Sequence, residues 1–168
     1  MNPGDKYRFT RHNAGAMALD VLFPEAGYAS NKALESSMAE LQNGDHLFIF
    51  QKPQTFMNLS GQAVQKALKK FNLKPSHLIV LHDEVELPVG EVRYKFGGGH
   101  KGHNGLRSIM AVTGTGDFHR IRIGVGRPAD DTNGIADYLL SFQPENQRAK
   151  KEQLLPAWNL ALAAINNA

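Results

Sequence analysis

Short apolar runs that suit strands alternate along this chain with stretches that have helical spacing, and this alternation limits the available folds. His77–Leu81 ("HLIVL") is short and apolar after its histidine, as expected of a strand covered on both faces. Val92–Phe96 and His119–Gly126 alternate apolar with basic residues, whereas Ala14–Leu22 and Asn104–Val112 carry apolar residues at helical spacing. The pattern predicts an α/β fold of three layers, with a mixed, twisted central sheet flanked by helices.

Turn signals and spacing predict the remaining elements. Ala33–Leu41 favours a strand, which turns at Asn43-Gly44 into a second strand, His46–Gln51. Ser60 is a favoured N-cap residue and predicts the start of a helix. The apolar face of that helix is Ala63, Val64, Ala67, Leu68 and Phe71.

Two helices are expected near the end of the chain. A short one lies near Gly134–Leu140, and a longer one follows it. Pro156 is expected to kink or split the longer helix, because proline lacks the backbone N–H. The apolar stripe of this helix is Leu155, Trp158, Leu162 and Ile165.

Composition narrows the class of protein. A chain of 168 residues has the size of a single domain, here residues 1–168, with a substantial core. The absence of cysteine excludes disulfides, thiolate metal sites and a cysteine nucleophile. No apolar stretch approaches the roughly 18–20 residues of a membrane span, and no signal peptide opens the chain, so we expect a cytoplasmic protein without a membrane partner.

Charge is distributed unevenly. The segment Arg93–Arg127 has a net charge of +6, which leaves −3 on the remainder of a chain whose total is +3. Such a segment beside glycine-rich loops favours a polyanionic partner, although a solvated basic face would look the same. Its seven basic residues are Arg93, Lys95, Lys101, Arg107, Arg120, Arg122 and Arg127.

Four polar clusters lie at the ends of the predicted elements, where α/β folds build their sites. They are Asn2–Gly15, Thr55–Gly61, Leu81–Gly90 and Phe96–Arg107.

Two short-motif matches within these clusters indicate other functions, each weakly, and a third motif is missing. Gly97–Gly102 ("GGGHKG") fits the dinucleotide-binding pattern, but a lone match late in the chain carries little weight. His100 and His103, with His82-Asp83, resemble a metal phosphohydrolase, yet no carboxylate stands at ligand spacing in the glycine loop. No serine occupies a G-x-S-x-G elbow, so a serine acyl-enzyme has no support.

His12 and Asp83 are the residues best suited to acid–base chemistry. A histidine is the natural general base at neutral pH, and a carboxylate can fix its tautomer. Asn2, Asn58 and Asn104 can orient water or peptide groups without adding charge. Each of these residues also has a structural alternative, as a helix start, a strand-end turn or an N-cap.

Together the clusters resemble bacterial peptidyl-tRNA hydrolase. That family has five motifs in this order, and here they occupy positions from Asn2 to Pro128. They read NPG…Y…TRHNAG, TFMNLSG, HDE…LP.G, GGGH.GHNGL and FHR.RIG.G. The resemblance implies an α/β monomer that hydrolyses the ester between peptide and transfer RNA in peptidyl-tRNA, without a metal or another cofactor. An RNA-binding module of the same fold without turnover is the alternative.

The resemblance also implies roles for individual residues. His12 is the catalytic base and Asp83 its partner. Lys95 and Arg122 match the clamp for the 5′ phosphate of transfer RNA, in agreement with the two basic strands. The residues implied in substrate binding are Asn2, Tyr7, Met57, Asn58, His103 and Asn104.

One departure from the family concerns the first strand. Family members begin with an apolar strand that runs into the NPG turn, whereas here Met1 stands where that strand should end. We therefore expect a sheet that lacks an internal strand, with exposed apolar faces and unpaired backbone groups. Asn2 is expected on a fraying terminus, and the C-terminal helix looks short.

Overall fold

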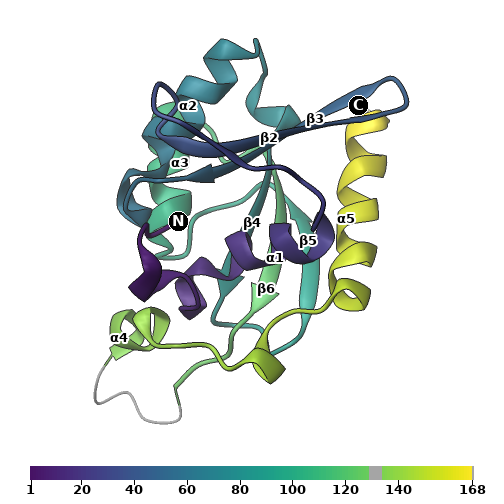
Figure 1. Ribbon diagram of the computed structural model, residues 1–168. Helices are drawn as coiled ribbons and strands as arrows, with labels where there is room; N and C mark the ends of the chain where they lie inside the picture. Colours follow the sequence, from purple (N-terminus) through teal and green to yellow (C-terminus); the bar gives the residue numbers. More distant parts are fainter. Residues whose placement is uncertain (129–133, 168) are drawn as a thin grey trace.

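Strands form the middle layer of the molecule. A computed structural model describes residues 1–128 and 134–167, in which six strands make two three-stranded sheets (Figure 1). One sheet is antiparallel, in the order β1-β2-β3; the other has the order β4-β6-β5, with β4 parallel and β5 antiparallel to β6. The strands are β1 (Ala29–Asn31), β2 (Ser36–Asn43), β3 (His46–Pro53), β4 (Ile79–Glu84), β5 (Val92–Phe96) and β6 (His119–Gly124).

Helices cover both faces of the strands, so the predicted three-layer α/β architecture with a mixed sheet is confirmed. Helices α2 and α3 pack together on one face, and α1 and α5 pack together on the other (Figure 1). The helices are α1 (Ala14–Leu22), α2 (Ser60–Lys70), α3 (Asn104–Thr113), α4 (Gly134–Leu140) and α5 (Lys151–Asn166). Short 3₁₀ turns occupy Asp5–Tyr7, Arg11–Asn13, Met57–Leu59, Pro75–His77 and Glu145–Gln147.

Strand β4 divides the core in two, because its successive side chains point to opposite faces. Ile79 and Leu81 pack against the cluster formed by α1, α5 and β6, whereas Val80 packs against the cluster between α2 and α3. The second cluster centres on Phe118, which is fully buried. The prediction of a strand covered on both faces is therefore confirmed for this segment.

Several predicted boundaries were wrong for local reasons. The strand expected from Ala33 begins at Ser36, because the chain turns at Glu35, whose φ is +47°. The short strand β1 carries no alternating pattern and was missed. Neither Ser60 nor Asn58 caps α2: the N-cap residue is Leu59, and its side chain makes no capping hydrogen bond.

Helix α5 differs from its prediction in two respects. It runs unbroken through Pro156, so the expected split does not occur. Its buried stripe begins at Leu154, whereas Leu155 is exposed. The stripe continues through Ala157, Trp158 and Ala161, at the spacing of one helical face.

No helix of the described residues is long and apolar enough to cross a membrane.

Gly15 lets α1 approach β4 closely. A Cβ atom at this position would lie 2.0 Å from the carbonyl oxygen of Leu81, a backbone atom that cannot rotate away. The contact matters for the site, since Gly15 follows the turn that carries His12, and Leu81 precedes Asp83 by two residues. The close approach therefore sets the separation of two predicted catalytic residues.

We expect Gly15→Ala to destabilise the protein. Alanine favours a helix by about 1 kcal/mol over glycine, but forcing apart a packed helix and strand costs about 1–3 kcal/mol or more. Thermal unfolding should show a lower melting temperature for this variant. Gly27→Ala is the matched control, because a Cβ there meets no atom within 4 Å; equal melting temperatures for the two variants would contradict the close-packing role of Gly15.

Candidate active site

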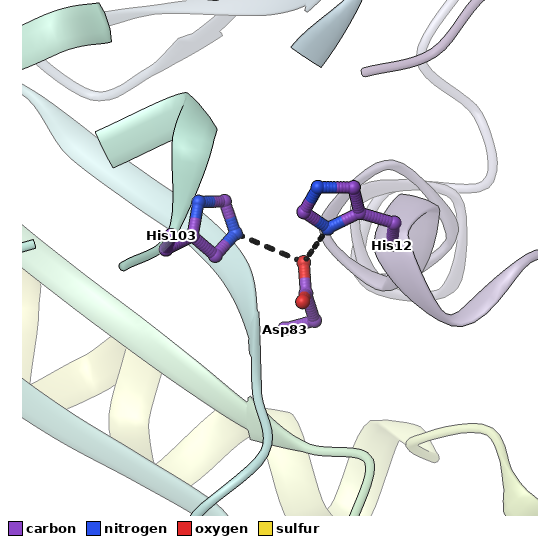
Figure 2. Close-up of side chains that lie close together, drawn as sticks. All are labelled: His12, Asp83 and His103. Atoms are coloured by element: carbon purple, nitrogen blue, oxygen red, sulfur yellow. Dashed lines mark hydrogen bonds and ion pairs between the residues drawn. The ribbon is translucent and has the colours of Figure 1, made fainter. Parts of the chain in front are cut away.

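Three side chains from distant segments meet at the end of β4 (Figure 2). His12 comes from the turn before α1, Asp83 from β4 and His103 from the residue before α3. One carboxylate oxygen, Oδ1 of Asp83, lies 2.9 Å from Nδ1 of His12 and 3.0 Å from Nε2 of His103. The ring centroids of the two histidines are 5.0 Å apart. The sequence predicted the first pair; the contact of His103 with Asp83 was not foreseen.

The hydrogen bond to Asp83 fixes the state of His12. With an ionised carboxylate as partner, Nδ1 carries the proton and donates it, which leaves the lone pair on Nε2. His12 is 8% exposed and lines a cavity. Within the described residues Nε2 makes no hydrogen bond, and it is not among the buried atoms without a partner. The atom that would accept a proton is therefore open to the cavity.

His103 has the opposite tautomer, and the backbone of α3 decides it. Its Nδ1 accepts from the backbone N–H of Gly105 at 3.1 Å and of Leu106 at 3.2 Å, so the ring acts as the N-cap of α3. Nε2 must then carry the proton of the neutral ring, and it donates to Asp83. His103 thus joins the glycine-rich loop to the His12–Asp83 pair.

The charge state of the cluster follows from these contacts. Burial alone would raise the pKa of Asp83, but the charges and hydrogen bonds of His103 and His12 hold it well below its usual range. The adjacent His82 is buried, and its ring meets that of His103 edge-on at 5.1 Å. Burial lowers the pKa of His82 to about 3, so this imidazole stays neutral. The site therefore combines the ionised carboxylate of Asp83 with the neutral ring of His82.

The same three residues have to be tested as metal ligands, because their donor atoms lie within 4.8 Å of one another. A metal needs a free lone pair on each ligand atom. His103 would have to offer Nε2, yet two backbone N–H groups already occupy the lone pair of Nδ1. A proton on Nδ1 would point at the N–H groups of Gly105 and Leu106, and both of their hydrogen bonds to the ring would be lost. The donor set therefore does not fit a three-ligand metal site.

Asn2 is held firmly, so the expected fraying terminus was wrong. Asn2 is 6% exposed, and its side-chain oxygen accepts from the backbone N–H of Met57 at 2.8 Å. Its own backbone N–H donates to the side chain of Asn13, which donates in return to the carbonyl of Asn2. Asn13 is almost fully buried and was not singled out from the sequence, although it adjoins His12.

Of the other predicted substrate-binding residues, only some line a cavity beside the cluster. Met57 lines the same cavity as His12. Gly105 leaves room for the Met57 side chain, because a Cβ atom at position 105 would lie 2.7 Å from the Met57 sulfur. Asn58 is exposed, and Asn104 is exposed with its oxygen accepting from Arg107 at 2.6 Å. Tyr7 is half-buried and contacts Phe56 edge-on, outside the residues that line the cavity.

A second cavity of about 340 Å³ adjoins the cluster and gathers the basic residues. Lys95 and Arg122 both line it, as does Arg120. The register explains this, since Lys95 lies opposite Arg120, and Arg93 opposite Arg122, so the basic side chains share one face of β5 and β6. The structure therefore brings the two predicted phosphate ligands to one cavity beside Asp83.

These basic residues are not equivalent. Arg120 is buried, and its guanidinium donates to the carbonyl oxygens of Gly98, Gly99 and Gly116, so it holds the glycine-rich loop in place. Arg122 pairs with Glu84 at 3.0 Å. No acidic partner of Lys95 occurs within residues 1–128 and 134–167. Of the two predicted phosphate ligands, Lys95 is thus the one that no ion pair in the described residues occupies.

The glycine-rich loop does not form a dinucleotide site of the usual kind. Such a site needs free N–H groups at the start of the following helix. Here the ring of His103 takes the N–H groups of Gly105 and Leu106, and the loop carbonyls turn to Arg120.

The neutral state of His82 predicts a pH dependence of stability. An unfolded histidine takes up a proton near pH 6.5, whereas folded His82 does so only near pH 3, so stability falls as the pH drops through this window. We expect the free energy of unfolding to fall about 2–3 kcal/mol further for the wild type than for His82→Phe between pH 7 and pH 4.5. Urea titrations at both pH values measure this difference; parallel losses in the two proteins would refute it.

Comparison with known proteins agrees with this geometry. Residues 1–167 match the family described as peptidyl-tRNA hydrolase. Peptidyl-tRNA hydrolase of Geotalea daltonii is 48% identical over 147 residues, covering 86% of this chain and 75% of that protein. The protein of the same name from Sorangium cellulosum is 50% identical over 150 residues, covering 88% and 67%.

A solved structure shows the same relation. Crystalline peptidyl-tRNA hydrolase from Acinetobacter baumannii has a TM-score of 0.82 and 30% identity to this chain, covering 98% of this chain and 90% of that one. The chain therefore belongs to the peptidyl-tRNA hydrolase family, and the resemblance inferred from its five motifs is confirmed.

Proposed function

We propose that this protein hydrolyses the ester bond between peptide and transfer RNA in peptidyl-tRNA, and releases both products. The observation that carries the proposal is the 2.9 Å contact between His12 and Asp83, with Nε2 of His12 open to a cavity. Membership of the peptidyl-tRNA hydrolase family supplies the substrate class.

The proposed reaction starts with a water molecule beside Nε2 of His12. His12 takes a proton from this water as it attacks the ester carbonyl, and the ionised Asp83 stabilises the imidazolium that forms. The amide groups of Asn58 and Asn104, or nearby backbone N–H groups, then stabilise the oxyanion. Asn2 and Met57 hold the walls of the peptide side of the site, with Tyr7 behind them.

The proposed transfer RNA contact lies on the basic face of β5 and β6. Lys95, which has no acidic partner within the described residues, and Arg122, which Glu84 orients, receive the 5′ phosphate. A lysine acts there as a point charge, whereas an arginine adds directed hydrogen bonds. We propose that the protein acts as a monomer in the cytoplasm, needs no metal or other cofactor, and recycles transfer RNA for translation.

The catalytic role of His12 is tested by His12→Ala in a turnover assay on peptidyl-tRNA. We expect kcat to fall about 10²–10⁴-fold, because the general base is lost, while the variant still folds, since His103 keeps its hydrogen bond to Asp83. His46→Ala removes an exposed histidine at the start of β3 and should retain wild-type activity. Near-normal kcat in His12→Ala would rule out the proposed role.

The same assay separates the alternatives. A wild-type protein that binds the substrate without turnover would be an RNA-binding module instead of an enzyme. Full activity after EDTA treatment is expected; loss of activity would indicate a metal phosphohydrolase-like site.

The phosphate role of Lys95 is tested by Lys95→Gln through the salt dependence of transfer RNA binding. Each phosphate contact releases counterions, so the slope of log K against log salt should fall by about one, with weaker binding at low salt. Lys66→Gln removes the same charge from the exposed face of α2, where Lys66 pairs with Glu35. Unchanged affinity and slope in Lys95→Gln would exclude the contact.

A further inference from the structure

Two exposed phenylalanine rings lie beside the turn that carries His12. Phe142 is 61% exposed and Phe9 is 37% exposed, and the two rings meet edge-on with their centroids 6.4 Å apart. Phe9 precedes His12 by three residues, so the Cα atoms of these two residues are at most about 11 Å apart. The rings therefore adjoin the candidate active site, although neither of them lines its two cavities.

Hydrogen bonds hold Phe142 against this turn. The backbone N–H of Gln143 donates to the carbonyl of Phe9 at 2.7 Å. Arg11, the neighbour of His12, donates from its guanidinium to the carbonyl of Phe142 at 2.7 Å. In Figure 1 the segment that follows α4 accordingly lies beside the first turns of the chain. The position of Phe142 relative to His12 is therefore fixed by the fold.

Two arginines stand over these rings, and we call Arg8, Phe9, Phe142 and Arg148 the aromatic patch. The guanidinium carbon of Arg8 lies 5.1 Å from the Phe9 centroid, and that of Arg148 lies 4.3 Å from it. Nε of Arg148 donates to the carbonyl of Gln143 at 3.0 Å, whereas its two terminal amino groups make no hydrogen bond within residues 1–128 and 134–167. Neither arginine has an acidic partner in that part of the chain.

The chemistry of the aromatic patch suits an unpaired nucleotide. Bases stack on aromatic rings, and arginines bind phosphates and stack on bases. An acidic peptide would match the two cations but not the open ring of Phe142. In peptidyl-tRNA the ester is carried by the last nucleotide of an unpaired 3′ end. Nucleotides next to that ester must pass close to His12, where the aromatic patch lies.

We propose that the aromatic patch binds the unpaired 3′-terminal nucleotides of transfer RNA, an inference that rests on the proposed function. A base stacks on the ring of Phe142, and Arg8 and Arg148 bind the flanking phosphates. Phe9, whose ring lies beneath both guanidinium groups, keeps them in place. The contact is separate from the proposed 5′ phosphate site, because no residue of the patch lines the cavity that contains Lys95.

A binding cycle with deacylated transfer RNA tests the proposal without requiring hydrolysis. Removal of the last three nucleotides should weaken binding to the wild type at least about fivefold, the lower limit for one stacked base. Phe142→Leu keeps an apolar side chain but has no ring, so it should bind the shortened RNA as the wild type does and lose its preference for the intact RNA. Phe142→Trp should keep that preference. No effect of shortening on the wild type, or an equal effect on wild type and Phe142→Leu, would overturn the proposal.

The phosphate contact is tested by Arg8→Gln, because Arg8 is exposed. The slope of log K against log salt for the intact RNA should fall by about 0.7, the value per phosphate of a single strand. Lys69→Gln removes an exposed charge from α2 and should leave this slope unchanged. Equal slopes for the two variants would exclude the contact.

Two further measurements separate this inference from its rivals. A polyglutamate peptide that displaces the intact RNA from the wild type but not from Phe142→Leu would assign the patch to an acidic protein segment instead. Turnover of peptidyl-tRNA by a wild type that shows no ring-dependent binding would overturn this inference alone. Ring-dependent binding by a wild type without turnover would overturn the proposed function alone.

Discussion

One carboxylate oxygen joins three distant parts of this chain. Oδ1 of Asp83 accepts from His12, 71 positions away, and from His103, 20 positions away. A buried, ionised carboxylate is costly unless it is hydrogen-bonded, so the two rings are as necessary to Asp83 as Asp83 is to them. The interaction therefore determines both the shape of the site and the tautomer of His12.

The surrounding loops are fixed by buried polar side chains instead of by apolar packing. Asn13 binds the backbone of Asn2, and Asn2 in turn binds the N–H of Met57, which connects the first and second polar clusters. Arg120 holds the carbonyls of the glycine-rich loop, and His103 ties the end of that loop to Asp83. Networks of this kind are rigid only when each member is satisfied, which explains why small and amide residues are concentrated here.

The hydrogen bonding of the middle layer differs between the end of β4 that carries Asp83 and the region between β3 and β4. At the end of β4 that carries Asp83, Nδ1 of His12 lies 2.9 Å from Oδ1 of Asp83, although within the described residues the two sheets are not paired with each other. Strands β3 and β4 instead line a common cavity. Close packing of α1 against β4 at Gly15 positions His12 without help from β3, so the geometry of the His12–Asp83 pair does not depend on a continuous sheet.

The sequence by itself determined the α/β class, most strand and helix positions, the pairing of His12 with Asp83, and the basic face that includes Lys95. These follow from periodicities of two and 3.6 residues and from ordered motifs, which are local properties. Only the tertiary structure decided that His103 shares the carboxylate, that Arg120 supports a loop instead of facing an anion, and that Leu154 is buried where Leu155 was expected. The reason is physical: a side chain's partners and tautomer depend on which backbone groups the fold brings within hydrogen-bond distance, and residue spacing along the chain does not contain that information.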